Sequence, residues 1–306
     1  MTYNQLWKRL TAIYNEREAQ AIVRTVLDAL FGMSLTDICL GKVTQLSADD
    51  TTRLEKIMQR LEKSEPVQYV LGAEWFAGRL FNVAPGVLIP RPETEDLVKW
   101  ACDEAKEKEK EDNSKEERGK EEEEVSKKGE EAPHPSILDI GTGSGCIAIT
   151  VALALPQARV TAWDISTDAL AIAAGNAHRL GASVRFEHQD ALSAPDDEAC
   201  WDVIVSNPPY ICDKERADMS DNVLSYEPEL ALFVPDSDPL LFYRAITRYA
   251  SKALKPGGRL LFETNTAYAH EVAQTMANEG FTAIEVRNDC FGKPRMVKGV
   301  FLKVKR

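Results

Sequence analysis

The 306-residue sequence contains few of the residues that bind metals or form disulfides. It has only four histidines and six cysteines, and no two cysteines form a C-x-x-C pair. We therefore expect no zinc site, and scattered thiols of this kind fit a reducing cytosol. No apolar run approaches the ~20 residues that span a bilayer, and the amino terminus lacks the pattern of a signal peptide. These absences predict a soluble, cytoplasmic protein.

Positive charge is also scarce, because the formal net charge is −12. Residues 103–131 alone hold fourteen acidic and eight basic side chains, hence a net −6. Proteins that bind nucleic-acid duplexes normally carry a basic face, since contacts to phosphate dominate their affinity. The composition gives no support for a general nucleic-acid binder.

The first 72 residues have the spacing of amphipathic helices. Apolar residues recur at helical intervals from Leu54 to Leu61, after a potential N-cap at Ser47. A second apolar stripe upstream ends at Gly32, a residue typical of helix C-termini. The chain is longer than one average domain. We expect residues 1–72 to be a small helical bundle with a structural or partner-binding role.

The pattern changes after this bundle. Residues 73–90 predict a short β-hairpin, with apolar pairs on both sides of Gly78 and a further apolar run at residues 87–89. Residues 91–306 form the second expected domain, which opens with a helix that Thr94 can cap.

That helix leads into a charged insertion at residues 103–135. Its low apolar content and high charge predict a disordered segment or a solvated single helix on the surface. A binding tail is the alternative function for it.

From Ser136 onward, strand and helix patterns alternate. Strands separated by helices of 10–15 residues predict an α/β fold, a Rossmann-like sheet of seven mostly parallel strands covered on both faces. No helix separates the last two strands, which predicts an antiparallel pair, and Lys255–Gly258 predicts a turn into the fifth strand. The expected strands are 137–140, 160–163, 184–186, 201–206, 259–263, 281–287 and 297–304, with helices at 147–155, 168–180, 240–254 and 269–279.

A glycine-rich loop, Gly141-Thr142-Gly143-Ser144-Gly145, joins the first of these strands to its helix. Glycines at this position let the backbone turn tightly and approach a ligand. Asp164 ends the next strand, where a carboxylate can bind the ribose hydroxyls of a nucleoside, or cap the helix after Ser166, or do both. The loop is one residue shorter than a dinucleotide loop. It therefore fits S-adenosylmethionine, which carries a sulfonium and an amino acid instead of a pyrophosphate.

Two further positions follow the third and fourth strands. Asp190 and Ala191 lie where an adenine ring should pass, and Asp190 can accept from its amino group or simply cap the loop. At the fourth strand end stands Asn207-Pro208-Pro209-Tyr210. The Asn207 side-chain carbonyl and a backbone carbonyl fixed by proline can accept both hydrogens of a planar –NH2 group, and the tyrosine ring can cover it. Such acceptors stabilise positive charge that develops on the nitrogen during methyl transfer. A plain strand-to-turn junction is the alternative.

The order of these motifs resembles the PrmC/HemK family of N5-glutamine methyltransferases of peptide chain release factors. The resemblance covers nearly the whole chain outside residues 103–135. It includes the glycine loop, Asp164 and Asn207–Tyr210, and it extends to the segments 66–72, 88–95 and 226–232. Because the tetrapeptide also occurs in adenine and cytosine amino methyltransferases, the specific part is its combination with the helical domain and the Ile89–Glu95 segment.

The resemblance implies a class I methyltransferase fold and S-adenosylmethionine as cofactor. It assigns cofactor binding to the glycine loop, Asp164, Asp190, Ala191 and Asn207. Substrate binding falls to Asn207, Pro208, Pro209 and Tyr210, with catalysis at Asn207, Pro208 and Tyr210. Class 1 release factors are then the protein partners, bound by the N-terminal domain, and no direct contact with nucleic acid is expected.

Two other functions stay open at this point. One is an amino methyltransferase of nucleic acid, acting on adenine N6 or guanine N2, which needs a basic groove or a recognition domain. The other is a non-enzymatic scaffold that only binds the cofactor. The chain also departs from the family at Ala191, where some members have an aromatic residue, and in its charged insertion.

Overall fold

The computed structural model describes residues 1–120 and 134–302. These residues divide into two compact units. One contains residues 1–73 with residues 83–85 and 218–227, and the other contains the remainder. Within the described residues, no helix is long and apolar enough to cross a membrane.

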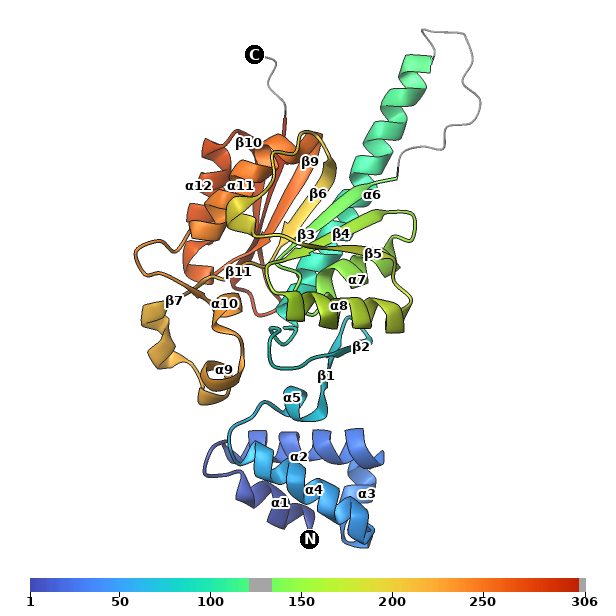
Figure 1. The fold of residues 1–306 in the computed structure, drawn as a ribbon, viewed down its shortest axis with the longest axis vertical. Helices are drawn as coiled ribbons and strands as arrows, with labels where there is room; N and C mark the ends of the chain where they lie inside the picture. Colours follow the sequence, from blue (N-terminus) through green and yellow to red (C-terminus); the bar gives the residue numbers. More distant parts are fainter. Residues whose placement is uncertain (121–133, 303–306) are drawn as a thin grey trace. The chain divides into compact units, whose positions relative to one another are not determined.

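The first unit contains six helices and one 3-10 turn (Figure 1). As predicted, Ser47 caps a helix by accepting from the backbone N–H of Asp50, and Gly32 ends another with a positive φ of 61°. The buried core collects one apolar stripe from each of the longer helices, including Val23, Leu27 and Leu54. The elements are α1 (Tyr3–Arg9), α2 (Glu16–Phe31), α3 (Leu35–Cys39), η1 (Lys42–Gln45), α4 (Ala48–Leu61) and α5 (Val67–Leu71), and α9 (Asp221–Tyr226) belongs to the same unit.

The hairpin prediction is confirmed for its first half. β1 (Ala73–Phe76) pairs with β2 (Arg79–Asn82) around Ala77 and Gly78, both of which have positive φ. Residues 87–89 are not a strand. Pro90, directly after them, has no backbone N–H to donate. The three remaining residues are too few to form the hydrogen bonds of a paired strand.

The second unit contains the predicted sheet of seven strands in the order β10-β11-β9-β6-β3-β4-β5. β3, β4, β5, β6 and β9 pair in parallel, while β11 is antiparallel to both β9 and β10. The residues predicted as a turn, Lys255–Gly258, already belong to β9. The bounds are β3 (Ser136–Ile140), β4 (Arg159–Asp164), β5 (Val184–His188), β6 (Trp201–Ser206), β9 (Leu254–Glu263), β10 (Phe281–Asn288) and β11 (Pro294–Phe301).

Alternating side chains divide the core into two layers, because successive residues of a strand point to opposite faces. Ile137 and Val205 pack under α6 (Glu93–Lys120), α7 (Cys146–Ala154) and α8 (Thr167–Leu180). Leu138 and Ile204 pack on the other face under α11 (Leu241–Ala253) and α12 (Ala269–Asn278). Smaller elements complete the unit: η2 (Ala191–Ser193), β7 (Ile211–Cys212), η3 (Asp213–Asp218), α10 (Glu229–Leu232), β8 (Phe233–Val234) and η4 (Thr266–Tyr268).

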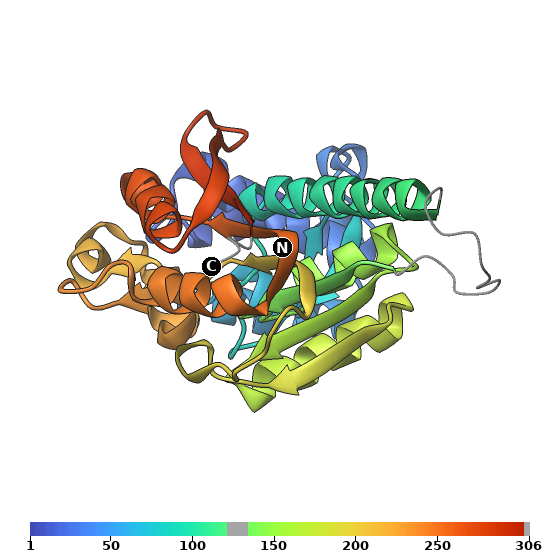
Figure 2. The same cartoon turned by 90° about the horizontal axis from the view of Figure 1, so that it is seen from above.

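The start of the charged insertion packs against this sheet, which corrects the prediction for residues 103–112. α6 is one long helix to Lys120: its first part lies along the sheet, and its end projects beyond the strands (Figure 1, Figure 2). Glu104 and Lys108 are 5% and 3% exposed. Glu104 accepts from Lys298 at 2.5 Å, and Lys108 lies 3.9 Å from Asp202. Lys298 and Asp202 are distant in sequence from α6, so local composition could not reveal the packing. Residues 121–133 of the predicted insertion lie outside the described residues.

Thr94 does not cap this helix. α6 begins one residue before it, at Glu93, and the Thr94 side chain is 2% exposed. Its hydroxyl donates to the Glu263 carboxylate at 2.6 Å.

Candidate active site

A cavity of about 290 Å³ opens at the carboxyl ends of β3, β4 and β6. This edge is where open α/β sheets bind ligands. Most of the residues predicted for the site line it: Gly141, Gly143, Asp164, Asp190, Ala191, Asn207, Pro208 and Pro209.

Within the glycine loop, Gly141, Gly143 and Gly145 turn the backbone, and Thr142 anchors it. Gly141 and Gly143 line the cavity with φ values of +77° and +56°, which non-glycine residues rarely adopt. Gly145 has a φ of +82°, and an added Cβ would lie 2.7 Å from the end of the Ile149 side chain and 3.1 Å from the Ala173 Cβ, so backbone conformation and packing both favour glycine there. Thr142 and Ser144 are 3% and 1% exposed and do not line the cavity. Their side chains therefore do not face the cavity.

Thr142 anchors the loop to Asp139, a residue for which the sequence motifs predicted no role. Its hydroxyl donates to the Asp139 carboxylate at 2.6 Å, and the backbone N–H of Ala148 donates to the same oxygen at 3.2 Å. Asp139 is fully buried, and this burial raises its pKa to about 7, although the two hydrogen bonds oppose the rise. An acidic residue inside an otherwise apolar strand, directly before the loop, was the signal that could have identified it.

Asp164 supports the loop and also faces the cavity. One carboxylate oxygen accepts from the backbone N–H of Gly143 at 2.8 Å and the other from Ser166 at 2.9 Å. Ser166, and not Asp164, is the N-cap of α8, because its side chain accepts from Ala169. Each carboxylate oxygen has a second lone pair, so Asp164 can accept further hydrogen bonds from a ligand.

Asp190 caps η2 by accepting from the backbone N–H of Leu192 at 2.8 Å, and it lines the cavity as well. Beside it, Ala191 and Leu192 form an apolar wall, which Phe242 and Ile246 of α11 continue. The helix was predicted, but its two cavity-facing residues were not. Helical periodicity cannot tell which part of an apolar face meets a ligand.

The first three residues of the tetrapeptide after β6 face the cavity, and the fourth packs in the core. Asn207, Pro208 and Pro209 line the cavity, whereas Tyr210 packs against the buried cluster beneath α11 and is not part of the lining. The Tyr210 hydroxyl donates to Glu263 at 3.2 Å. Burial, with the negative charge of Glu263, raises the pKa of Tyr210 far above its usual range. The Asn207 amide nitrogen lies 3.4 Å from the Thr94 hydroxyl oxygen.

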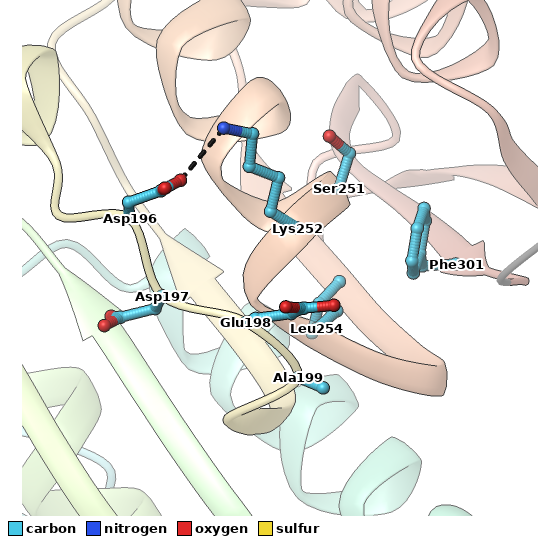
Figure 3. Close-up of a pocket in the computed structure, with 8 residues that line it drawn as sticks. All are labelled: Asp196, Asp197, Glu198, Ala199, Ser251, Lys252, Leu254 and Phe301. Carbon is cyan, nitrogen blue, oxygen red and sulfur yellow. Dashed lines mark hydrogen bonds and ion pairs between the residues drawn. The ribbon is translucent and has the colours of Figure 1, made fainter.

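A second hollow lies at the opposite edge of the sheet (Figure 3). Its lining comes from the loop before β6, the end of α11, the start of β9 and the end of β11. Asp196 forms an ion pair with Lys252 at 3.0 Å, and the neighbouring acids Asp197 and Glu198 come from the same loop. Amino ends of parallel strands are not where such folds place their ligands, so we assign no site to it.

Comparison with known proteins agrees with this geometry. The "PrmC N-terminal domain" family model matches residues 3–72, and the "Methyltransferase small domain" model matches residues 126–226. A release factor glutamine methyltransferase of Bacteroides thetaiotaomicron is 44% identical over 94% of this chain and 95% of its own length.

Two further relatives carry the same name. The protein of Flavobacterium psychrophilum is 37% identical over 96% of both chains. That of Chlorobaculum tepidum is 36% identical over 93% of this chain and 92% of its own. The resemblance seen in the motifs is confirmed at full length, with the fold class it implied. This chain belongs to the release factor glutamine methyltransferase family.

Proposed function

We propose that this methyltransferase transfers a methyl group from S-adenosylmethionine to the side-chain amide nitrogen of a glutamine, in the Gly-Gly-Gln motif of class 1 peptide chain release factors. One observation carries the proposal: Asn207, Pro208 and Pro209 line the same cavity as the glycine loop and Asp164. Acceptors for an –NH2 group thus lie beside a nucleoside-binding edge. The names of the relatives support the choice of substrate.

The lining fits the cofactor. Gly141 and Gly143 leave room for its amino-acid part, and Asp164 can accept from the ribose hydroxyls. Asp190 stands beside the apolar wall of Ala191, Leu192 and Ile246, where an adenine ring would be held by its faces and its amino group. S-adenosylmethionine would supply a methyl group on a positively charged sulfonium sulfur, which leaves as a neutral thioether when its bond to the methyl group breaks.

The residues after β6 would act on the substrate nitrogen. An amide nitrogen is a poor nucleophile because its lone pair is delocalised. The Asn207 side-chain carbonyl and the backbone carbonyl of Pro208 accept its two hydrogens and stabilise the positive charge that develops on it. No strong base is required, since the nitrogen can lose its proton to water afterwards. Alignment of the two reactants can contribute on the order of 7–11 kcal/mol.

We further propose that residues 1–72 bind the release factor. This unit contributes no residue to the cavity, and its family model is distinct from that of the catalytic unit. A release-factor substrate would place the enzyme in the cytoplasm.

The test compares two substrates with labelled S-adenosylmethionine. We expect label on an intact class 1 release factor, at the peptide that contains Gly-Gly-Gln, and none on DNA or RNA. Digestion and mass spectrometry then locate the methyl group on the glutamine. Label on nucleic acid alone would favour an adenine or guanine amino methyltransferase instead.

A further inference from the structure

We propose that Glu263 and Thr94 are positioning residues that fix which end of the Asn207 amide faces the cavity. This inference rests on the proposed function, in which the Asn207 carbonyl oxygen accepts from the substrate. An asparagine amide presents an acceptor or a donor depending on a half-turn of its last bond. A site that needs the acceptor must therefore prevent that turn.

Glu263 provides the fixed point. It ends β9, and it is 1% exposed. Two hydroxyl groups converge on its carboxylate: Thr94 donates to one oxygen at 2.6 Å, and Tyr210 donates to the other at 3.2 Å. Burial raises the pKa of Glu263 above its usual value, although the Thr94 hydrogen bond, the positive charge of Arg295 and the Tyr210 hydrogen bond oppose the rise. The two carboxyl oxygens accept from Thr94 and Tyr210, so both hydroxyl protons point toward Glu263.

Thr94 passes this orientation to Asn207. A hydroxyl group has one proton, and Thr94 gives it to Glu263. The side that Thr94 presents to Asn207, 3.4 Å away, is therefore an oxygen lone pair. Only the –NH2 end of the amide is attracted to a lone pair. The carbonyl end is left toward the cavity, which Asn207 lines. At 3.4 Å the bond is too long to add much stability, but it still distinguishes a donor from an acceptor.

The end of β9 also holds the other end of the tetrapeptide. Glu263 binds the Tyr210 hydroxyl, and the Asn265 side chain donates to the Tyr210 backbone carbonyl at 3.2 Å. Tyr210 thereby supports the turn from the core side. Thr94 of the Ile89–Glu95 segment thus contacts Asn207 of the tetrapeptide, which lies 113 residues further along the chain. This contact explains physically why the two motifs occur together.

The first test removes the hydroxyl while keeping the shape of the side chain. Thr94→Val should lower kcat by roughly tenfold, the scale of one lost orienting hydrogen bond. The Kd for S-adenosylmethionine, from calorimetry, should stay unchanged. Thr94→Ser should recover most of the loss, because serine keeps the proton for Glu263. The matched control is Thr150→Val, a buried threonine of α7 whose hydroxyl has no hydrogen-bond partner among the described residues.

A second variant guards against misfolding of the first. In Glu263→Gln the new amide can donate to Thr94, which frees the Thr94 proton to turn toward Asn207. We expect a similar fall in kcat with a normal cofactor Kd. The inference is overturned if both variants keep the wild-type kcat. It is also overturned if they lose cofactor binding in parallel with rate, since a role through Asn207 does not predict that.

The double variant separates this inference from the proposed function. If Thr94 acts through Asn207, adding Thr94→Val to Asn207→Ala should slow the enzyme no further. Additive losses would refute the inference and leave the function standing. If Asn207→Ala alone methylates the release factor at the wild-type rate, the proposed function fails first.

Discussion

Two ends of the same catalytic unit hold buried carboxylates in different ways. At the carboxyl edge of the sheet, hydroxyl and amide groups hold them: Thr94 and Tyr210 donate to Glu263, and Thr142 and Ala148 donate to Asp139. Beneath α6, cations hold Glu104. Lys298 lies 2.5 Å and Arg259 3.4 Å from its oxygens. Arg259 and Glu263 belong to the same strand, β9, so the two arrangements lie four residues apart in sequence.

The first kind of carboxylate orients hydrogen bonds, and the second kind holds a helix on the sheet. A hydroxyl has one proton to give, so a carboxylate held by hydroxyls fixes the direction of a hydrogen-bond network. A carboxylate held by two cations gains Coulomb energy that offsets its desolvation, and it fastens a helix to a sheet. Changes at the first kind should affect rate or pH response, and changes at the second should affect stability.

The largest effect is expected at the residue that the first network orients. Asn207→Ala should lower kcat by roughly 10²–10³, the loss usually seen when one preorganised group is removed. Cofactor affinity should change far less, because the lost contact is made mainly in the transition state. Steady-state kinetics on an intact release factor, with calorimetry for the cofactor, measure both. A kcat equal to that of the wild type under saturating cofactor would contradict this account of the site.

Asp139 should give the next largest effect, on stability as a function of pH. Its pKa is raised to about 7 in the folded state, against an ordinary 3.8, so the folded protein binds the proton more tightly. The free energy of unfolding should therefore fall by at most about 4 kcal/mol as the pH rises from about 4 to 7. Above pH 7 this contribution should stay constant. Urea unfolding at several pH values should show this slope in the wild type and a flatter one in Asp139→Asn. Equal slopes would exclude Asp139 as the titrating group.

The cation-held carboxylate should behave differently. Glu104→Ala leaves Arg259 and Lys298 buried with one partner fewer, which should lower the free energy of unfolding by about 3 kcal/mol. The kcat at saturating substrate should hardly change, because none of these residues lines the cavity. Glu107→Ala, an exposed position on the same helix, is the matched control. A large loss of kcat at unchanged stability would remove the distinction between the two ends.

The same contrast explains what the sequence could and could not predict. The glycine loop, Asp164 and the residues after β6 were identified because each follows a strand end, and strand ends are visible as local patterns. Thr94 was misread as a helix cap, since its partner Glu263 is 169 residues away. Residues 103–112 were misread as a free insertion for the same reason. Long-range pairs of polar residues leave no periodic signal in one sequence.

A smaller effect is expected at Asp164, which supports the glycine loop and is also proposed to bind the cofactor. Asp164→Ala removes the acceptor for Gly143 and the proposed acceptor for ribose. The binding free energy of S-adenosylmethionine should weaken by about 1–3 kcal/mol, the scale of hydrogen bonds to a charged group. Unchanged affinity by calorimetry would remove Asp164 from the ribose site.

The smallest effect is expected where α6 leaves the cation-held region. Lys108 pairs with Asp202 and Asp112, and Glu111 pairs with Arg259. A deletion of residues 106–131 removes these pairs and should destabilise the fold. A deletion of residues 115–131, closed by about ten Gly/Ser residues, removes a stretch with almost no apolar side chains and should change the melting temperature and kcat little. Thermal unfolding of the two deletions side by side tests this. If the shorter deletion lowers the melting temperature as much as the longer one, then the ion pairs at residues 104–112 are not the last contacts of this segment that stabilise the fold. Residues 115–131 would then contribute to stability as well.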